Sequence, residues 1–187
     1  MKKPLLALLA FSTVLLSGCR NLGKEVSQDE FYKFYSETFV MERPEYEKIE
    51  TKGKVVNPET NETLDLKTTL QEGVPCDTYT DRVAYTFIYS YAPITYVLQS
   101  INGLDKTKVK FFIDESKVEY SIKIKTSFDD TYIDIMGRVV KSNAENDITY
   151  TWNKYADLIY MVDHSKYKED GQIYQKNIEF SATCFYK

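Results

Sequence analysis

The chain has 187 residues, of which 24 are Lys or Arg and 28 are Asp or Glu, so its formal net charge is -4. This acidic balance, together with the absence of a Lys/Arg-rich run, argues against nucleic acid as a partner and against electrostatic adhesion to an anionic membrane. Aromatic residues make up 14% of the chain and cluster with Ile, Val and Thr, the side chains that favour strands, so we expect a mostly β protein.

The first nineteen residues have the pattern of a lipoprotein signal. Lys2 and Lys3 form a positively charged start, an apolar stretch runs from Leu5 to Leu16, and Ser17-Gly18 then precedes Cys19. This order resembles a bacterial lipobox, in which a diacylglyceryl group is attached to the cysteine sulfur and cleavage occurs before that cysteine. The alternative is a short transmembrane anchor with an incidental cysteine, but roughly 15 apolar residues fall short of the ~20 that span a bilayer.

This pattern predicts how the chain is organised. Residues 1–18 are a signal peptide, residues 19–26 are the lipidated Cys19 with a short polar tether, and residues 27–187 form a single globular domain. Removal of the signal peptide takes away Lys2 and Lys3 and changes the formal charge to -6. Each buried CH₂ contributes ~0.8 kcal/mol, so two acyl chains would hold the domain at the extracytoplasmic face of the cell membrane.

A short helix is predicted after the tether. Ser27 and Glu30 have the spacing of a capping box, in which each side chain accepts a hydrogen bond from the other residue's backbone amide. Phe31, Phe34 and Tyr35 follow at helical spacing, so a helix of about ten residues should lay one aromatic face on the core. Pro44 ends any helical continuation.

The next segments predict a hairpin, a loop and a broken helix. Strands from Tyr46 to Val56 and from Thr63 to Leu70 flank a turn at residues 57–61, and a loop containing Cys76 follows. Apolar residues then recur at helical spacing from Asp81 to Ile101. Pro93 lies in the middle of that stretch and should kink it or start a second helix, while Asn102-Gly103 stops it.

The remainder of the chain is predicted to be an antiparallel meander. The clearest strand runs from Val118 to Lys125, where apolar and polar residues alternate, so one face should be buried and the other wet. Turns are expected at Glu115-Ser116, at residues 142–147, at Asn153 to Ala156 and at Asp170-Gly171. The other predicted strands are Val109–Ile113, Tyr132–Val140, Ile148–Trp152, Leu158–Val162 and Ile178–Tyr186.

We therefore expect an α+β, mostly β fold: a bent antiparallel sheet of about seven to nine strands, covered by two or three short helices. The lipobox, the short helix, the hairpin, the helical segment and a strand run with the turn Trp152-Asn153-Lys154-Tyr155 resemble small surface lipoproteins of low-GC Gram-positive bacteria. More distantly they resemble the LolA/LppX/LprG-like lipoprotein carriers. That resemblance implies a half-barrel whose helices cover a cavity that accepts acyl chains.

The resemblance also implies a set of residues that would line the cavity. The helical segment would face the strands across it, and the alternative is that these side chains simply fill a core. The implied lining residues are Phe87, Tyr91, Leu98, Ile101, Tyr120, Ile122, Tyr150 and Trp152.

The two cysteines after Cys19 leave two alternatives open. An exported protein permits a disulfide between Cys76 and Cys184, and closing a loop of about a hundred residues would stabilise the fold by ~4 kcal/mol. Otherwise each thiol behaves as a small buried hydrophobe. The sequence decides neither.

Residues with catalytic or metal-binding chemistry are sparse. The one histidine lies in Asp163-His164-Ser165, but neighbouring residues on a strand point to opposite faces and cannot align as a triad. Zinc would need further histidines or paired cysteines. The pairs Asp129-Asp130 and Asp114-Glu115 lack the ligand spacing of a calcium loop. We expect no enzyme and no cofactor.

Two functional hypotheses follow. The first is a lipid-anchored, non-catalytic protein that binds an apolar ligand, such as a lipid, between sheet and helices. The second is a module with a filled core that presents a face or edge of its sheet to another protein of the cell envelope. An enzyme is a distant third, and it would need convergent ionisable groups around His164, Asp129 and Asp130.

Overall fold

A computed structural model of the chain describes residues 20–42, 44–56, 63–70, 94–133 and 136–187. Its centre is one antiparallel sheet of eight strands in the order β1-β4-β5-β9-β10-β13-β2-β3, not closed into a barrel. The expected α+β, mostly β class is confirmed. The strands are β1 (Lys24–Val26), β2 (Tyr46–Val56), β3 (Thr63–Leu70), β4 (Val109–Asp114), β5 (Glu119–Lys125), β9 (Asp147–Trp152), β10 (Leu158–Asp163) and β13 (Asn177–Tyr186).

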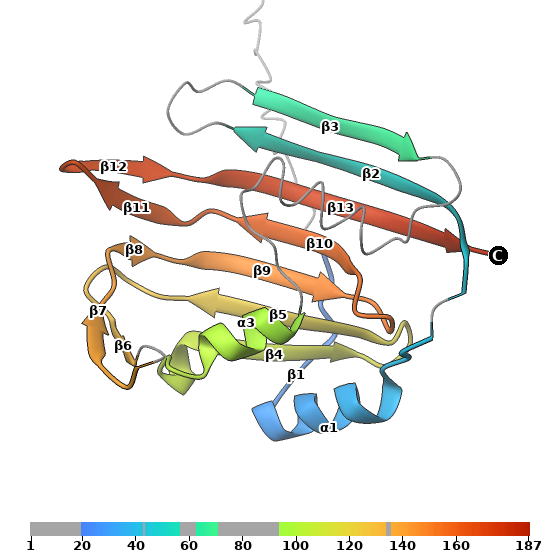
Figure 1. Cartoon of the computed structure of the whole chain (residues 1–187), viewed down its shortest axis with the longest axis horizontal. Coiled ribbons are helices and arrows are strands. Elements are labelled where there is room, and N and C mark those ends of the chain that lie inside the picture. The colour runs from blue at the N-terminus through green and yellow to red at the C-terminus, as the bar shows by residue number, and fades with distance from the viewer. Residues whose placement is uncertain (1–19, 43, 57–62, 71–93, 134–135) are drawn as a thin grey trace, which may run out of the picture.

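Two small sheets and two α-helices complete the part of the chain that is described (Figure 1). The three-stranded sheet has the order β12-β11-β8, and the two-stranded sheet pairs β6 with β7. These elements are α1 (Gln28–Thr38), α3 (Ile94–Ile101), the 3₁₀ turn η1 (Lys106–Lys108), β6 (Thr131–Ile133), β7 (Val139–Lys141), β8 (Ala144–Glu145), β11 (Lys166–Glu169) and β12 (Gln172–Gln175).

The first two strands of the chain, β1 and β2, lie near opposite edges of the sheet. β1 pairs with β4 and forms one edge, whereas β2 pairs with β13 and β3 forms the other edge (Figure 1). The predicted β2–β3 hairpin is confirmed, in a register that runs from Ile49 opposite Leu70 to Val56 opposite Thr63. The turn predicted at residues 57–61 lies outside the described residues.

Helix α1 begins as its sequence predicts. Ser27 Oγ accepts a hydrogen bond from the Glu30 amide at 3.2 Å, and Glu30 Oε2 accepts one from the Ser27 amide at 2.9 Å. Together they satisfy two amide groups at the helix start that have no partner within the helix. Phe31 is fully buried, and Phe34 and Tyr35 pack against the core from the same side of the helix.

The predicted helical stretch from Asp81 to Ile101 is described only in its second half. Helix α3 covers Ile94–Ile101 and ends at the expected place, where the Leu104 amide donates to the Ile101 carbonyl at 3.0 Å. The first half, the preceding loop and Pro93 itself lie outside the described residues. A kink or a split at Pro93 therefore stays a prediction.

The core lies on the face of the sheet that α1 and α3 cover, which we call the inner face. Strand alternation places Phe111, Ile122, Tyr150 and Met161 there in one lateral row, because these residues are paired across β4, β5, β9 and β10. All four are buried, as is Ile101 of α3. The opposite face, which we call the outer face, carries Glu119, Ser121, Thr151 and Tyr160.

The expectation of one wet face on the strand after Glu115 holds only at the end of β5, where Lys123 is half-buried and Lys125 is exposed. On the outer face Ser121 is 1% exposed, Thr151 is 0% exposed and Glu119 is 8% exposed. The hydroxyls of Ser121 and Thr151 are hydrogen-bonded to each other at 2.9 Å. The strand also starts one residue late, at Glu119, because Val118 has a φ of 53° and belongs to the turn.

The expected single strand from Tyr132 to Val140 was wrong. The chain turns near Gly137, which has a φ of +77°, and the two halves pair as the β6–β7 hairpin with Ile133 opposite Val139. A glycine with a positive φ is typical of such a turn. The segment predicted as a polar turn at residues 142–147 contains the short strand β8. By contrast, the Asp170-Gly171 hairpin is confirmed, and it joins β11 to β12.

Candidate functional site

The described members of the predicted lining set lie together on the inner face. Leu98, Ile101, Tyr120, Ile122, Tyr150 and Trp152 all belong to, or pack against, one apolar cluster. Tyr120, Ile122 and Trp152 have no exposed surface, and Tyr150 is 8% exposed. Phe87 and Tyr91 lie outside the described residues. The structure therefore places these six in one cluster, whether they fill a core or line a cavity.

Aromatic rings of α1 enclose Tyr120. The ring centroids of Phe34 and Tyr35 lie 5.7 Å and 5.0 Å from that of Tyr120, in edge-to-face geometry, and the centroid of Phe31 lies at 6.3 Å. The Tyr120 hydroxyl contacts Thr38 Oγ1 at 2.8 Å. Burial raises the pKa of Tyr120 above its ordinary value, so the hydroxyl stays neutral. This end of the inner face is filled by the protein's own side chains.

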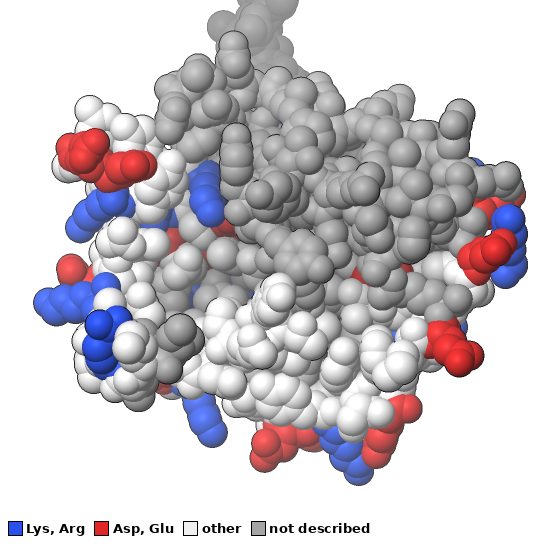
Figure 2. Space-filling view, viewed as in Figure 1, with Lys and Arg blue, Asp and Glu red and all other residues white. Residues whose placement is uncertain are grey.

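The other end of the cluster lies under α3. Ile94, Val97 and Ile101 of α3 are buried, whereas Tyr96 on the opposite side of the helix is 56% exposed. Charged side chains visible on this side of the molecule lie towards its rim, and the surface over α3 is uncharged (Figure 2). Helix α3 itself carries no charged residue.

Tyr150 and Trp152 stand side by side on β9, where Tyr150 is paired with Ile122 and Trp152 with Tyr120 of β5. Their rings are stacked, with centroids 5.5 Å apart and planes inclined by 23°. Burial and the nearby Asp163 carboxylate raise the pKa of Tyr150 well above its ordinary value. A neutral phenol and an indole form a surface suited to apolar contact rather than to proton transfer.

The sequence Asp163-His164-Ser165 does not form a triad. The Ser165 amide, not its hydroxyl, donates to Asp163 Oδ1 at 2.9 Å, and Lys176 Nζ lies 3.4 Å from Asp163 Oδ2. His164 Nδ1 lies 3.3 Å from Asn177 Oδ1. The Ser165 hydroxyl accepts a hydrogen bond from the Asp147 amide at 3.2 Å, so the three side chains have separate structural partners.

One carboxylate of each acidic pair holds a turn. Asp130 Oδ2 accepts from the Ser127 amide and contacts Lys108 Nζ at 3.1 Å, and these contacts hold the pKa of that carboxyl below its ordinary value. Asp114 Oδ2 lies 2.8 Å from Lys117 Nζ, and its other oxygen accepts from Ser116. Within the described ranges, no group of three or more Cys, His, Asp or Glu residues is placed to hold a metal ion.

The segment expected to be a tether is bound to the sheet instead, so that expectation was wrong. Arg20 donates from Nη2 to Glu119 Oε1 at 2.7 Å, and its guanidinium carbon lies 5.4 Å from the centroid of the Tyr160 ring. Lys24 to Val26 form β1, paired with Ile113 to Phe111 of β4. No local pattern indicates the contact, because Arg20 and Glu119 are 99 residues apart and neither belongs to a motif.

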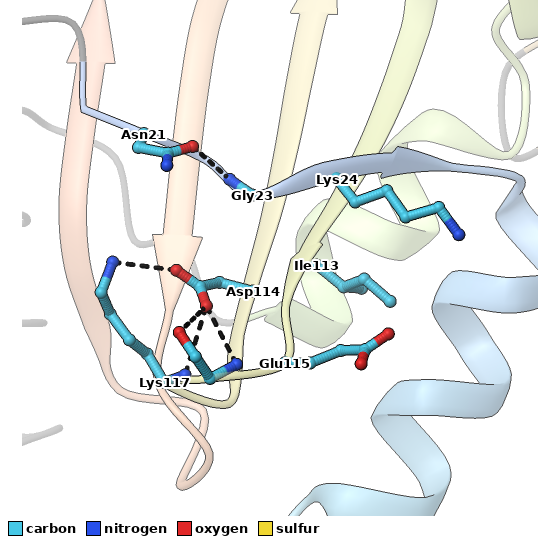
Figure 3. Close-up of a pocket in the computed structure, with 8 residues that line it drawn as sticks. Asn21, Gly23, Lys24, Ile113, Asp114, Glu115 and Lys117 are labelled. Atoms are coloured by element: carbon cyan, nitrogen blue, oxygen red, sulfur yellow. Dashed lines mark hydrogen bonds and ion pairs between the residues drawn. The ribbon is translucent and has the colours of Figure 1, made fainter.

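A groove lies where this segment crosses the β4–β5 turn (Figure 3). It has a volume of about 440 Å³ and is open to solvent. Figure 3 shows the chain from Asn21 to Lys24 passing in front of the strands, with Asp114 and Lys117 held together below it. The residues that line the groove are Asn21, Gly23, Lys24, Ile113, Asp114, Glu115, Ser116 and Lys117. Of these, only Ile113 belongs to the apolar cluster.

The cysteines are described only in part. Cys184, on β13, is disulfide-bonded. Cys76, its expected partner, lies outside the described residues, as does Cys19, so the pairing and the lipidation both stay predictions. No helix in the described portion is long and apolar enough to cross a membrane. Comparisons with protein-family models, with curated proteins and with solved structures found no match.

Proposed function

We propose that this chain is a lipid-anchored, non-catalytic protein that works at the extracytoplasmic face of a cell membrane and binds an apolar ligand between its sheet and α3. Anchoring would come from a diacylglyceryl group on Cys19, as its lipobox-like sequence favours. In this proposal the eight-stranded sheet is bent like the half-barrel of the lipoprotein carriers that the sequence resembles, and the helices cover its concave face.

The observation that carries the ligand proposal is the apolar cluster under α3. Ile101 and Ile122 are at most 5% exposed, and Tyr150, which is paired with Ile122, has its ionisation suppressed. Ligand sites for apolar molecules are lined by aliphatic and aromatic side chains with few polar groups. The lack of charge over α3 (Figure 2) also suits an acyl chain better than a polar metabolite.

The single tryptophan offers a direct test. Trp152 lies in the cluster, so cis-parinaric acid bound between α3 and the sheet would accept its excitation energy and quench its emission. We expect saturable quenching that a saturated fatty acid reverses. Leu98→Lys on α3 should weaken this binding, and Tyr96→Lys, on the exposed side of the same helix, should leave it unchanged. Quenching that is linear and equal in all three proteins would contradict the proposal.

Co-purification gives a second test. The full-length protein would be extracted from its own membrane, separated from bulk lipid and examined by mass spectrometry under native conditions. We expect one non-covalently bound lipid in addition to the covalent mass on Cys19. If the covalent mass is present but no lipid is bound, lipidation of Cys19 is supported and the ligand proposal is contradicted.

A second candidate function is favoured by the opposite end of the cluster. The rings of Phe31, Phe34 and Tyr35 fill the space over Tyr120 and leave no role there for a ligand. If the core is filled throughout, the protein is an interaction module, and apolar residues on its small sheets would be the contact sites. Val139 of β7 and Ile173 of β12 are 74% and 59% exposed. The double variant Val139→Ser, Ile173→Ser should then no longer capture the envelope protein that the wild type captures. Parinaric acid should quench the tryptophan emission of neither the wild type nor the double variant.

A further inference from the structure

The segment that follows Cys19 is fixed to the sheet at three successive places. At the first, on the outer face, Arg20 is shared between Glu119 of β5 and Tyr160 of β10. The Arg20 side chain is 26% exposed and the Glu119 side chain 11%, so this ion pair is largely shielded from water. A shielded, hydrogen-bonded arginine–carboxylate contact holds its position better than an exposed pair does.

The second place is Gly23, where the chain turns from the outer face into the edge of the sheet. Gly23 has a φ of +87°, and a Cβ atom there would lie 2.2 Å from the Ile113 carbonyl oxygen. Asn21 Oδ1 also accepts a hydrogen bond from the Gly23 amide at 3.0 Å. Only glycine permits this close approach in a left-handed conformation.

The third place is β1 itself. Its residues pair with β4 from Lys24 opposite Ile113 to Val26 opposite Phe111, and Glu25 contacts Lys110 at 3.0 Å. Helix α1 begins one residue after Ser27, so no free chain separates the segment from the globular core. Residues 20–26 are therefore part of the folded domain, and we call them the anchor mount.

We propose that the anchor mount holds the lipidated Cys19 against the outer face, so that the domain rests on the bilayer with this face turned towards the lipid head groups. The inference rests on the proposed lipidation of Cys19. A free tether of seven residues would allow a separation of up to about 25 Å, because an extended chain spans ~3.3–3.6 Å per residue. With Arg20 fixed, the anchored residue lies only ~3.8 Å from it along the chain.

Two of the three lysines that β4 and β5 place on the outer face are ion-paired. These lysines are Lys110, Lys123 and Lys125: Lys110 is paired with Glu25, Lys125 lies 3.8 Å from Asp147 Oδ2, and Lys123 lies opposite Lys110 and Thr149. Such exposed pairs cancel at a distance and add little attraction to anionic lipid. The mount, rather than a basic patch, determines which face meets the membrane, and the helices on the inner face are directed away from it.

Trypsin provides the first test, because it cleaves after Arg20 and after Lys24. The lipidated full chain on phosphatidylcholine vesicles would be treated briefly, and release of a fragment that begins at Asn21 or Glu25 would be followed by sedimentation and mass spectrometry. Cleavage after Arg20 requires Arg20 to leave Glu119 and Tyr160, and cleavage after Lys24 requires β1 to leave β4. Both cleavages should therefore be at least about tenfold slower than in a synthetic peptide of residues 19–28.

A matched pair of variants identifies the contact. Glu119→Gln removes the carboxylate that holds Arg20 and should speed release several-fold, while Glu115→Gln, on the neighbouring turn, should not. Thermal melting would show that both variants are folded. Release of the wild type at the peptide rate, or equal release from both variants, would overturn the anchor mount. Failure of the protein to sediment with vesicles would instead reject the lipid anchor, and cleavage at Arg20 in solution would still report on the mount.

Lysine acylation by a water-soluble ester tests the orientation. Lys125 on the outer face and Lys33 on α1 have nearly equal exposure, 73% and 74% of the side chain. On vesicles we expect Lys125 to react several-fold more slowly than Lys33. In protein that trypsin has released from the vesicles, the two lysines should react at similar rates. Equal rates on vesicles would show that the outer face does not meet the bilayer.

Discussion

The hydroxyl oxygens of Tyr120 and Thr38 lie 2.8 Å apart, although the two residues are 82 positions apart in the chain. Thr38 Oγ1 also donates to the Phe34 carbonyl at 2.6 Å, which uses its one proton. Tyr120 must therefore donate to Thr38. This bond fastens the last turn of α1 to the centre of the sheet, and it leaves the buried phenol satisfied.

Replacing Tyr120 tests whether it fills a core. Tyr120→Phe removes only the hydrogen bond and should lower the free energy of unfolding by about 1 kcal/mol. Tyr120→Ala should lower it by about 3–5 kcal/mol, because it leaves a cavity beneath three aromatic rings. Urea unfolding measures both. A double-mutant cycle with Thr38→Val should show that the two single losses are not additive.

The capping box of α1 should contribute measurably to the free energy of unfolding. Ser27→Ala removes the hydroxyl that accepts from the Glu30 amide, and we expect a loss of about 1 kcal/mol in the free energy of unfolding. Ser36→Ala, in the last turns of the same helix, is the matched control. The control should change stability little, because it removes only a bond back to the Lys33 carbonyl within the helix. Equal losses would argue against the cap.

Gly23→Ala should disturb both the backbone and the close approach to β4. The positive φ alone costs about 1 kcal/mol for alanine, and the contact with the Ile113 carbonyl adds to it, so we expect a total near 2–3 kcal/mol by thermal or urea unfolding. Gly171→Ala is the control, because Gly171 has a similar φ of +79° and a Cβ atom there would meet nothing within 4 Å. It should lose about 1 kcal/mol.

The β4–β5 turn should make stability depend on pH in the acid range. Contacts with Lys117 and Ser116 lower the pKa of Asp114 from 3.8 to about 2. The charged form is thus favoured in the folded state, so its contribution is present above pH 4 and is lost as the pH falls towards 2. We expect Asp114→Asn to cost up to about 1 kcal/mol at pH 7 and much less near pH 2, where the carboxyl is about half protonated. Urea unfolding across pH 2–7 measures the difference, and a constant difference would contradict it.

The disulfide at Cys184 should contribute strongly to stability. If its partner is Cys76, reduction opens a loop of about a hundred residues and should cost ~4 kcal/mol, measured as a lower melting temperature in the presence of reductant. Cys184→Ser and Cys76→Ser should each reproduce that loss and should not add to one another. Peptide mapping without reductant would identify the partner directly, and a Cys19–Cys184 peptide would exclude lipidation of that cysteine.

Local signals in the sequence determined much of the fold. Ser27 and Glu30 fix the start of α1, alternation fixes the bounds of β2 and β3, and Asp170-Gly171 fixes the β11–β12 hairpin. Each of these depends on residues within a few positions of one another, so backbone conformation and capping decide it. The mostly β class follows in the same way from alternation and aromatic content. Tyr120, Ile122, Tyr150 and Trp152 share one face of the sheet, because side chains alternate along a strand.

Only the tertiary structure decided what lies against the two faces of the sheet. Alternation predicted that Ser121 would be wet, but it has no information about what covers that face, and Ser121 and its partner Thr151 are both buried. The Arg20–Glu119 contact and the edge position of β1 join residues about a hundred positions apart, and no local pattern encodes such a pairing. The contact between the rings of α1 and Tyr120 likewise joins residues far apart in the chain, so it depends on how the helix packs on the sheet. The sequence determines which residues are apolar or charged, and packing determines what each of them meets.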